Sequence, residues 1–166
     1  MNHVEIVKSK IQDWPTMAET VSKWREDGQK IVFTNGCFDI LHLGHADYLA
    51  KASDLGTKLV VGLNSDLSVS RLKGPNRPIT DQKSRGFLLA SMSFVDAVVL
   101  FEEDTPEKLI ELVCPDVLVK GGDYVITEIV GHDFVASSGG KVVTIPLIEG
   151  YSTTEIENRI LNSGNK

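Results

Sequence analysis

Cysteine is scarce in this sequence: only Cys37 and Cys114 among 166 residues, far apart and without a CxxC pair. This spacing predicts neither a disulfide framework nor a zinc site. Positive charge is also in deficit, since 17 Lys and Arg stand against 23 Asp and Glu, a net charge of −6. Because nucleic acid and anionic membranes would repel such a chain at long range, we expect neither as a partner.

Long apolar runs are missing as well. The apolar stretch 97–101 is far too short to cross a bilayer, and the N-terminal MNHVEIVKSK lacks the apolar core of a signal peptide. We therefore expect a cytoplasmic protein. Its hydrophobic content of 42% and charged content of 24% are ordinary for a globular chain, and the length fits one domain.

Strand-like and helix-like segments alternate along the chain. Runs rich in Val, Ile and Leu predict strands at 30–34, 59–63, 97–101, 116–119 and 141–145. Helices are predicted at about 44–55, from 80, from 105 and at 153–161. Apolar strands separated by helices are typical of a parallel sheet that is covered on both faces. The sequence thus predicts an α/β, Rossmann-like fold with a five-stranded parallel sheet.

An amphipathic helical segment is expected at 1–28, in front of a main domain at 29–166. Thr16 and Glu19 have the spacing of a capping box, which predicts that the helix begins at this point. Gly28 follows the helix as a stop signal.

Ligands of such sheets bind beyond the carboxyl ends of the strands, so the residues that follow each strand are informative. The nucleotide motifs GxGxxG and GxxxxGK[ST] and the hydrolase motif GxSxG are missing. The first strand is followed instead by His42, Leu43, Gly44 and His45 at the start of a helix. Two imidazoles three residues apart share a helical face, and the amides of a helix N-terminus favour an anion. The motif predicts a site for the phosphates of a nucleoside triphosphate.

Two other interpretations of the histidines stay open. A metal ion could use both rings, but Asp39 alone is a weak third ligand and no Cys or further His completes the set, so no metal site is predicted. The histidines could also be ordinary surface or capping residues.

Basic and hydroxyl side chains follow other strands. Lys73 and Arg77 stand on a Gly/Pro-rich segment that is expected not to be helical, where they could close on phosphate oxygens or merely form a solvated basic loop. Ser152, Thr153 and Thr154 begin the last predicted helix, so one hydroxyl is expected to cap it and the others could hold phosphates.

Two further features are left open by the sequence. Lys120, Gly121, Gly122 and Asp123 follow a strand and would place their backbone beside a nucleoside, although the glycine pair could form a simple turn. Arg85 could reach a triphosphate or serve a surface ion pair.

The segment 36–39 (GCFD) followed by 42–45 (HLGH) resembles the signature of the cytidylyltransferase-like nucleotidylyltransferases. Four more motifs follow in the order found in the adenylyltransferase domain of bifunctional heptose-7-phosphate kinase/heptose-1-phosphate adenylyltransferases: RLKGPNRP (71–78), FEEDTP (101–106), LVKGGDY (118–124) and STT (152–154). This resemblance implies a stand-alone adenylyltransferase. Class I aminoacyl-tRNA synthetases share the histidine motif but need a KMSKS-type loop and a tRNA-binding extension, which do not fit here.

The resemblance implies transfer of AMP from ATP, accompanied by Mg²⁺, to D-glycero-D-manno-heptose 1-phosphate, giving ADP-heptose and pyrophosphate for lipopolysaccharide core or other surface glycans. The catalytic residues that it implies are His42, His45, Lys73 and Thr153. Contacts with the acceptor phosphate are implied for Asp39, Lys73 and Arg77. The nucleotide-binding residues that it implies are Asn35, Gly36, Cys37, Phe38, His42, Gly44, His45, Lys120, Gly122, Asp123, Ser152, Thr153 and Thr154.

Two rival functions were weighed against this expectation. A glycerol-3-phosphate-type cytidylyltransferase resembles the chain at 149–154 but usually carries Arg two residues before Glu149, where this sequence has Leu147. A non-catalytic nucleotide-sensing module would be favoured by loss of Lys73 or a histidine, and all are present. Small-molecule substrates are the expected partners, and a homo-oligomer stays an open alternative.

Overall fold

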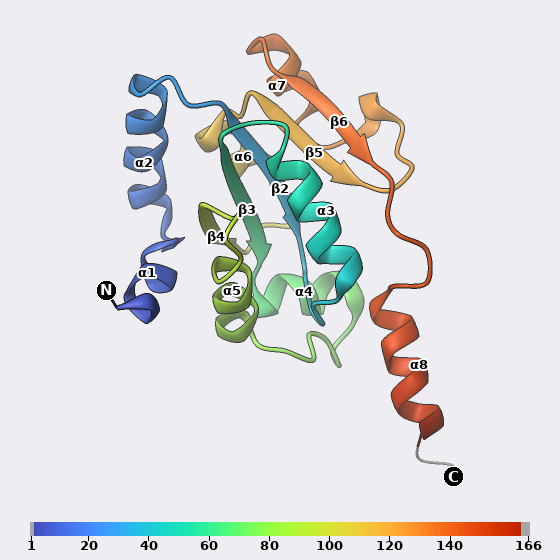
Figure 1. Cartoon of the computed structure of the whole chain (residues 1–166). Helices are drawn as coiled ribbons and strands as arrows, with labels where there is room; N and C mark the ends of the chain where they lie inside the picture. The colour runs from blue at the N-terminus through green and yellow to red at the C-terminus, as the bar shows by residue number, and fades with distance from the viewer. Residues whose placement is uncertain (1, 164–166) are drawn as a thin grey trace.

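Six parallel strands form one sheet, in the spatial order β1-β4-β3-β2-β5-β6 (Figure 1). The computed structural model describes residues 2–163. The strands are β1 (Ile11–Gln12), β2 (Ile31–Gly36), β3 (Lys58–Asn64), β4 (Ala97–Phe101), β5 (Val117–Gly121) and β6 (Lys141–Ile145). The α/β, Rossmann-like prediction is confirmed, but the expected count of five strands is wrong. A strand of two residues, β1, leaves no periodic pattern in the sequence.

Helices cover both faces of the sheet. They are α1 (His3–Ser9), α2 (Trp14–Glu26), α3 (Leu43–Ser53), α4 (Asp66–Lys73), α5 (Gln82–Ala90), α6 (Glu107–Val113), α7 (His132–Ser137) and α8 (Thr153–Ser163), with a 3-10 turn, η1 (Ile126–Glu128). One buried apolar layer joins the sheet to α3 and α5, through residues such as Leu49 and Leu89. A second layer joins the other face to α2 and α6, through residues such as Met17 and Ile110.

The N-terminal segment is more closely tied to the sheet than its sequence indicated. Asp13 caps α2 by accepting a hydrogen bond from the amide of Thr16 at 2.9 Å, so the expected capping box of Thr16 and Glu19 is wrong. A carboxylate is a strong N-cap, and the helix therefore begins earlier, at Trp14. Because β1 precedes α2 and pairs with β4, this segment contributes to the same sheet as the rest.

The segment that carries Lys73 is helical, against expectation. Ser65 accepts a hydrogen bond from the amide of Ser68 at 3.1 Å and so begins α4, which ends at Lys73. The Gly and Pro residues that predicted a non-helical segment all follow Lys73, and they end the helix instead of preventing it. The ammonium of Lys73 therefore extends from the last turn of a helix.

The order of the strands determines where a ligand can enter. From β2 the chain builds β3 and β4 on one side, and it later returns to place β5 and β6 on the other. In parallel sheets, such a reversal leaves a crevice at the carboxyl ends of the two neighbouring strands between which the order reverses. Here those strands are β2 and β5. No helix within residues 2–163 has the length and apolarity needed to span a membrane.

Candidate active site

A cavity of about 190 Å³ opens at the carboxyl ends of β2 and β5. Many of the predicted site residues line it, although they come from six separate segments of the chain. The lining residues are Asn35, Gly36, Cys37, Phe38, Asp39, His45, Tyr48, Lys73, Lys120, Gly121, Tyr124, Leu147 and Thr153. The crevice expected from the strand order is therefore also the place where the candidate chemical groups meet.

The two histidines stack at the start of α3. Their ring centroids lie 3.8 Å apart, with 25° between the planes, so the two rings do meet. The predicted shared helical face is only half right, because His42 is the N-cap of α3 with an extended backbone and His45 alone lies within the helix. The Phe38 ring lies edge-on to the His45 ring, with 5.2 Å between the ring centroids. Among the described residues, the Nδ1 atoms of both histidines are buried without a hydrogen-bond partner. Buried polar atoms are normally paired, so the hydrogen-bonding capacity of these two rings is not used up within the protein.

Both histidines are neutral near pH 7. Burial lowers the pKa of His45 to about 4, and the adjacent His42 and Lys73 add to this shift. Burial likewise lowers the pKa of His42. A neutral imidazole offers one N–H donor and one acceptor, so in the free protein these rings act through hydrogen bonds and not through charge.

Gly44 allows the two histidines to approach each other. A Cβ at this position would lie 3.0 Å from Cε1 of His42 and 3.2 Å from the carbonyl oxygen of Tyr151. The second contact is with backbone, which cannot easily move away. Nearby, Phe38 has a φ of 47°, a left-handed conformation that is strained for a residue with a bulky side chain. Strain of this kind often occurs at functional sites.

Positive charge at the cavity comes from two lysines and two helix N-termini. Lys73 is exposed, and the described part of the chain offers its ammonium no ion-pair partner. Lys120 lies with Nζ 5.6 Å from the centre of the Tyr124 ring, and burial lowers its pKa. The N-termini of α3 and α8 lie at the same cavity, through His45 and Thr153. Each adds a partial positive charge that favours an anion.

The hydroxyl run at the start of α8 divides its roles. Ser152 Oγ accepts a hydrogen bond from the amide of Glu155 at 3.1 Å, so the expected cap is Ser152. Thr153 lines the cavity, whereas Thr154 is exposed and is not part of the lining. One of the three residues is therefore used by the helix itself and one reaches the cavity.

Asp39 and Arg77 bind each other. Arg77 Nη1 donates to Asp39 Oδ2 at 2.8 Å, while Oδ1 accepts from the amides of Ile79 at 2.7 Å and Thr80 at 2.9 Å. Burial alone would raise the pKa of Asp39, but these hydrogen bonds from Thr80, Ile79 and Arg77 outweigh it and hold the pKa below its usual value. The Asp39 carboxylate is thus ionised, and both of its oxygens already accept hydrogen bonds from the protein itself.

Arg85, whose role the sequence left open, is buried away from the cavity. Its side chain is 1% exposed, so it forms no surface ion pair and does not reach the cavity. The guanidinium donates to the carbonyl oxygens of Thr80, Cys37 and Asn64 at 2.9, 2.6 and 2.8 Å. It also pairs with Asp66 at 2.7 Å. Arg85 therefore connects the loop after β2 to the end of β3 and the starts of α4 and α5.

Some predicted residues lie beside the cavity, and some lining residues were not predicted. His42, Gly44, Gly122 and Asp123 do not line it, although His42 stacks on His45. Gly121, from the predicted 120–123 segment, does line it, and the unpredicted lining residues are Tyr48, Tyr124 and Leu147. Tyr48 lies on α3 and lines the cavity, and its hydroxyl forms a hydrogen bond with Thr34 Oγ1 at 2.6 Å. For Tyr124, the available signal was its place directly after Lys120-Gly-Gly-Asp.

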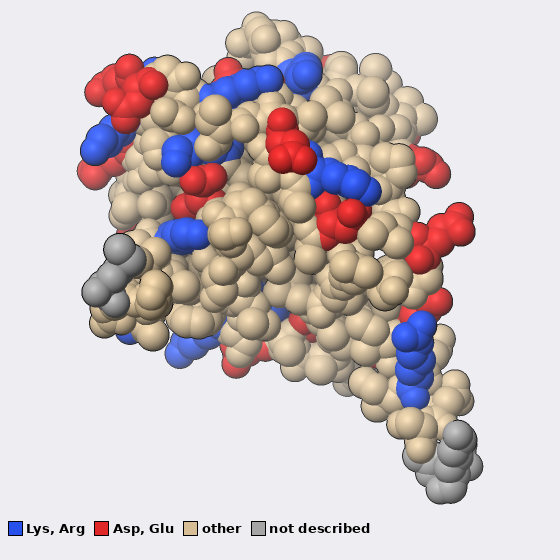
Figure 2. Space-filling model, viewed as in Figure 1, with Lys and Arg blue, Asp and Glu red and all other residues tan. Residues whose placement is uncertain are grey.

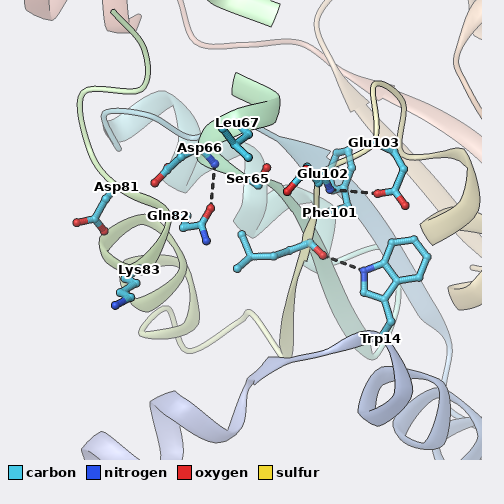
Figure 3. A pocket seen from close by; sticks show the side chains of 11 residues that line it. Trp14, Ser65, Asp66, Leu67, Asp81, Gln82, Lys83, Phe101, Glu102 and Glu103 are labelled. Atoms are coloured by element: carbon cyan, nitrogen blue, oxygen red, sulfur yellow. Dashed lines mark hydrogen bonds between the residues drawn. The ribbon is translucent and has the colours of Figure 1, made fainter. Parts of the chain in front are cut away.

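A larger cavity of about 690 Å³ lies at the ends of β3 and β4 (Figure 3). Four carboxylates and one lysine surround it: Asp66, Asp81, Glu102, Glu103 and Lys83. Figure 3 also shows Gln82 accepting a hydrogen bond from the amide of Asp66 across this cavity. An acidic lining repels phosphates, so size alone does not identify the nucleotide site.

No group of three or more His, Cys, Asp or Glu residues within 2–163 is arranged to hold a metal ion. Asp39, the weak third ligand that the sequence offered beside the two histidines, is occupied by Arg77 and two backbone amides. A divalent cation at this site would therefore need most of its ligands from a bound molecule or from water.

Comparison with known proteins identifies the family. A family model described as cytidylyltransferase-like matches residues 33–159. The bifunctional protein HldE of Magnetococcus marinus is 51% identical over 151 residues, which cover 91% of this chain and 31% of HldE. The chain spans about a third of the length of the curated relatives that it matches.

Solved structures agree with this assignment. The lipopolysaccharide core biosynthesis protein from Thermoplasma volcanium is 31% identical, with a TM-score of 0.58, and the match covers 75% of this chain and 100% of that protein. A pantoate-beta-alanine ligase from Francisella tularensis, solved with an ATP compound and beta-alanine, has a TM-score of 0.61, covering 94% of this chain and 79% of the ligase. At 16% identity, the second match shows a shared fold alone. The resemblance that the GCFD and HLGH motifs indicated is confirmed: the chain belongs to the cytidylyltransferase-like family.

Proposed function

We propose that this chain transfers AMP from ATP to a heptose 1-phosphate and releases pyrophosphate. The observation that carries the proposal is the meeting of His45, stacked on His42, with Lys73 and Thr153 at one cavity. Support for the heptose comes from the relatives named HldE and from the lipopolysaccharide core protein of similar structure. ATP is favoured over CTP because Leu147 stands where glycerol-3-phosphate cytidylyltransferases usually carry Arg.

The reaction needs alignment and charge stabilisation rather than a general base. An oxygen of the acceptor phosphate forms a bond to the α-phosphorus of ATP, while the bond from this phosphorus to the β-phosphate oxygen breaks. Because the second pKa of a phosphate monoester is about 6, the attacking oxygen is already ionised near neutrality. This accords with neutral histidines, which donate N–H groups without having to remove a proton.

Each group at the cavity has a role in the proposal. His42 and His45 hold oxygens of the reacting phosphate chain, and Lys73 bridges donor and acceptor phosphates. Thr153 and the N-terminal amides of α8 hold the leaving pyrophosphate. The turn at Gly36–Phe38 and the Lys120–Asp123 segment are assigned to the nucleoside. Magnesium enters with ATP as part of the substrate, bound mainly by phosphate oxygens and water.

The proposal extends to the cellular setting. We assign the reaction to the cytoplasm, where ATP is available, and its catalytic unit to residues 29–166. Small molecules are the proposed partners. The proposed reaction uses residues of one chain, so it can proceed in a monomer or in a homo-oligomer.

Pyrophosphate release tests the proposed function directly. ATP and CTP are each assayed with heptose 1-phosphates of both anomers, with other sugar 1-phosphates and with glycerol 3-phosphate. We expect ATP with a heptose 1-phosphate to be the best pair, and CTP with glycerol 3-phosphate to be poor. His42→Ala and His45→Ala should each lower kcat by on the order of 10²-fold. If CTP with glycerol 3-phosphate is the better pair, the rival cytidylyltransferase function replaces this one.

A further inference from the structure

Arg77 lies between two carboxylates from distant parts of the chain. Its Nη1 donates to Asp39 Oδ2 at 2.8 Å, and its Nη2 forms an ion pair with Oε1 of Glu157 in α8. The side chains of Asp39, Arg77 and Glu157 are 1%, 21% and 28% exposed, so neither pair is freely solvated. One guanidinium therefore connects the loop before the histidines to the C-terminal helix.

The Asp39 end of this connection is fixed. Besides Arg77, the buried carboxylate accepts the amides of Ile79 and Thr80 and the hydroxyl of Thr80 at 3.1 Å. These bonds join the segment after α4 to the loop after β2. The carboxylate that binds Arg77 is therefore held in place by three further hydrogen bonds.

The α8 end is loosely attached. Figures 1 and 2 show this helix extending away from the body of the protein, and none of its described residues is buried. An open groove separates its apolar side from the body of the protein: Ile160 and Leu161 of α8 line it together with Ile40 and Ile79, and both α8 residues are more than half exposed. Within residues 2–163, the ion pair of Glu157 with Arg77 is the one side-chain hydrogen bond or ion pair that connects α8 to a distant part of the chain.

Glu157 lies four residues after Thr153, so both side chains occupy the same face of α8. Thr153 lines the nucleotide cavity at the first turn, and the ion pair holds the next turn. Movement of Glu157 away from Arg77 would also move Thr153 and the N-terminal amides relative to the stacked histidines.

We propose that Glu157 and Arg77 are positioning residues whose ion pair sets the place of the α8 N-terminus over the nucleotide cavity. Arg77 then acts through α8, and its guanidinium does not bind the acceptor phosphate. The inference rests on the proposed function in that it takes Thr153 and the start of α8 as the site for the ATP phosphates.

Glu157→Gln removes the charge while keeping the size of the side chain, and Glu155→Gln is its matched control. Glu155 lies on the same helix and has no ion pair among the described residues. We expect Glu157→Gln to raise the Kd and KM for ATP by about three- to fivefold, the range that a partly exposed pair can supply. The value of kcat should stay within about twofold, since saturating ATP selects the correctly placed helix. Glu155→Gln should not raise either constant.

A double-mutant cycle separates this role from direct phosphate binding. If the pair is the cause, adding Glu157→Gln to Arg77→Gln should weaken ATP binding no further. If Arg77 binds the acceptor phosphate, Arg77→Gln raises the KM of the acceptor at unchanged ATP Kd, and the inference is wrong. Because Arg77→Gln also unpairs Asp39, its thermal midpoint is measured first; Glu157→Gln tests the inference even if that variant does not fold.

Calorimetric titration of ATP into the free enzyme needs no acceptor, so the inference can fail separately from the proposed function. Equal ATP Kd in Glu157→Gln and wild type, with normal turnover of heptose 1-phosphate, overturns the inference alone. Weaker ATP binding in Glu157→Gln, with no turnover of heptose 1-phosphate by wild type, overturns the acceptor assignment alone. Hydrogen exchange gives a second readout: amides of α8 should exchange faster in Glu157→Gln than in Glu155→Gln.

Discussion

The neutral state of His45 makes folding stability depend on pH in a calculable way. Its pKa is about 4 in the folded protein, against 6.5 for an unperturbed histidine. As pH falls below about 6.5, the unfolded chain takes up a proton that the folded protein refuses until about pH 4. The contribution is therefore complete above pH 6.5 and is lost as pH falls through this window. Between pH 7 and pH 5 the shift corresponds to about 2 kcal/mol, which we reduce to about 1 kcal/mol for solvent screening at a partly open ring.

Urea unfolding measures this difference. Wild type and His45→Gln are unfolded at pH 7 and pH 5, with the fluorescence of Trp14 and Trp24 as the signal. Wild type should lose about 1 kcal/mol more than His45→Gln over this range, because the variant has no imidazole to protonate. His3→Gln, which removes an exposed histidine of α1 far from the cavity, should behave as wild type. Equal losses in wild type and His45→Gln would show that burial does not keep this ring neutral.

Nucleotide binding should reverse the effect. A triphosphate placed beside the imidazoles favours their protonated form and raises their pKa values. At pH 6, ATP binding should therefore take up protons, and His45→Gln should take up fewer. Calorimetry in two buffers of different ionisation enthalpy measures the uptake. Proton release on binding would contradict the placement of phosphates against His45.

Three further predictions concern Lys73 at the cavity, the buried Arg85 and two glycines away from the cavity. Lys73→Ala should lower kcat by on the order of 10²-fold with little change in thermal midpoint or ATP Kd, because an exposed ammonium at the end of α4 contributes to the transition state and not to packing. An unchanged kcat would show that Lys73 does not bridge the two phosphates. Arg85→Lys should lower the free energy of unfolding by about 2–4 kcal/mol, because buried carbonyl oxygens lose their donors. Gly56→Ala should lower the free energy of unfolding by about 1–3 kcal/mol, because its Cβ would lie 2.6 Å from the carbonyl oxygen of Lys30. Gly86→Ala, whose Cβ would have its nearest neighbour at 3.6 Å, should leave the stability to urea unchanged or raise it.

The sequence by itself predicted the parallel sheet and the histidine pair. Both depend on local patterns: the strands at 97–101 and 141–145 are short apolar runs between helices, and their observed bounds are the predicted ones. The spacing of His42 and His45 brings their rings together at the start of α3, with His42 as the N-cap and His45 in the first turn. The family motifs, which are also contiguous, indicated the family that comparison confirmed.

Tertiary structure alone decided what each basic residue does. Lys73, Arg77 and Arg85 lie within a short stretch of sequence, and each seemed able to reach a phosphate. Packing buries Arg85 among carbonyl oxygens, pairs Arg77 with two carboxylates and leaves Lys73 at the cavity. These outcomes depend on which distant segments lie beside each guanidinium or ammonium group. Burial and pairing of a charge are properties of its neighbours in space, and no local pattern encodes them.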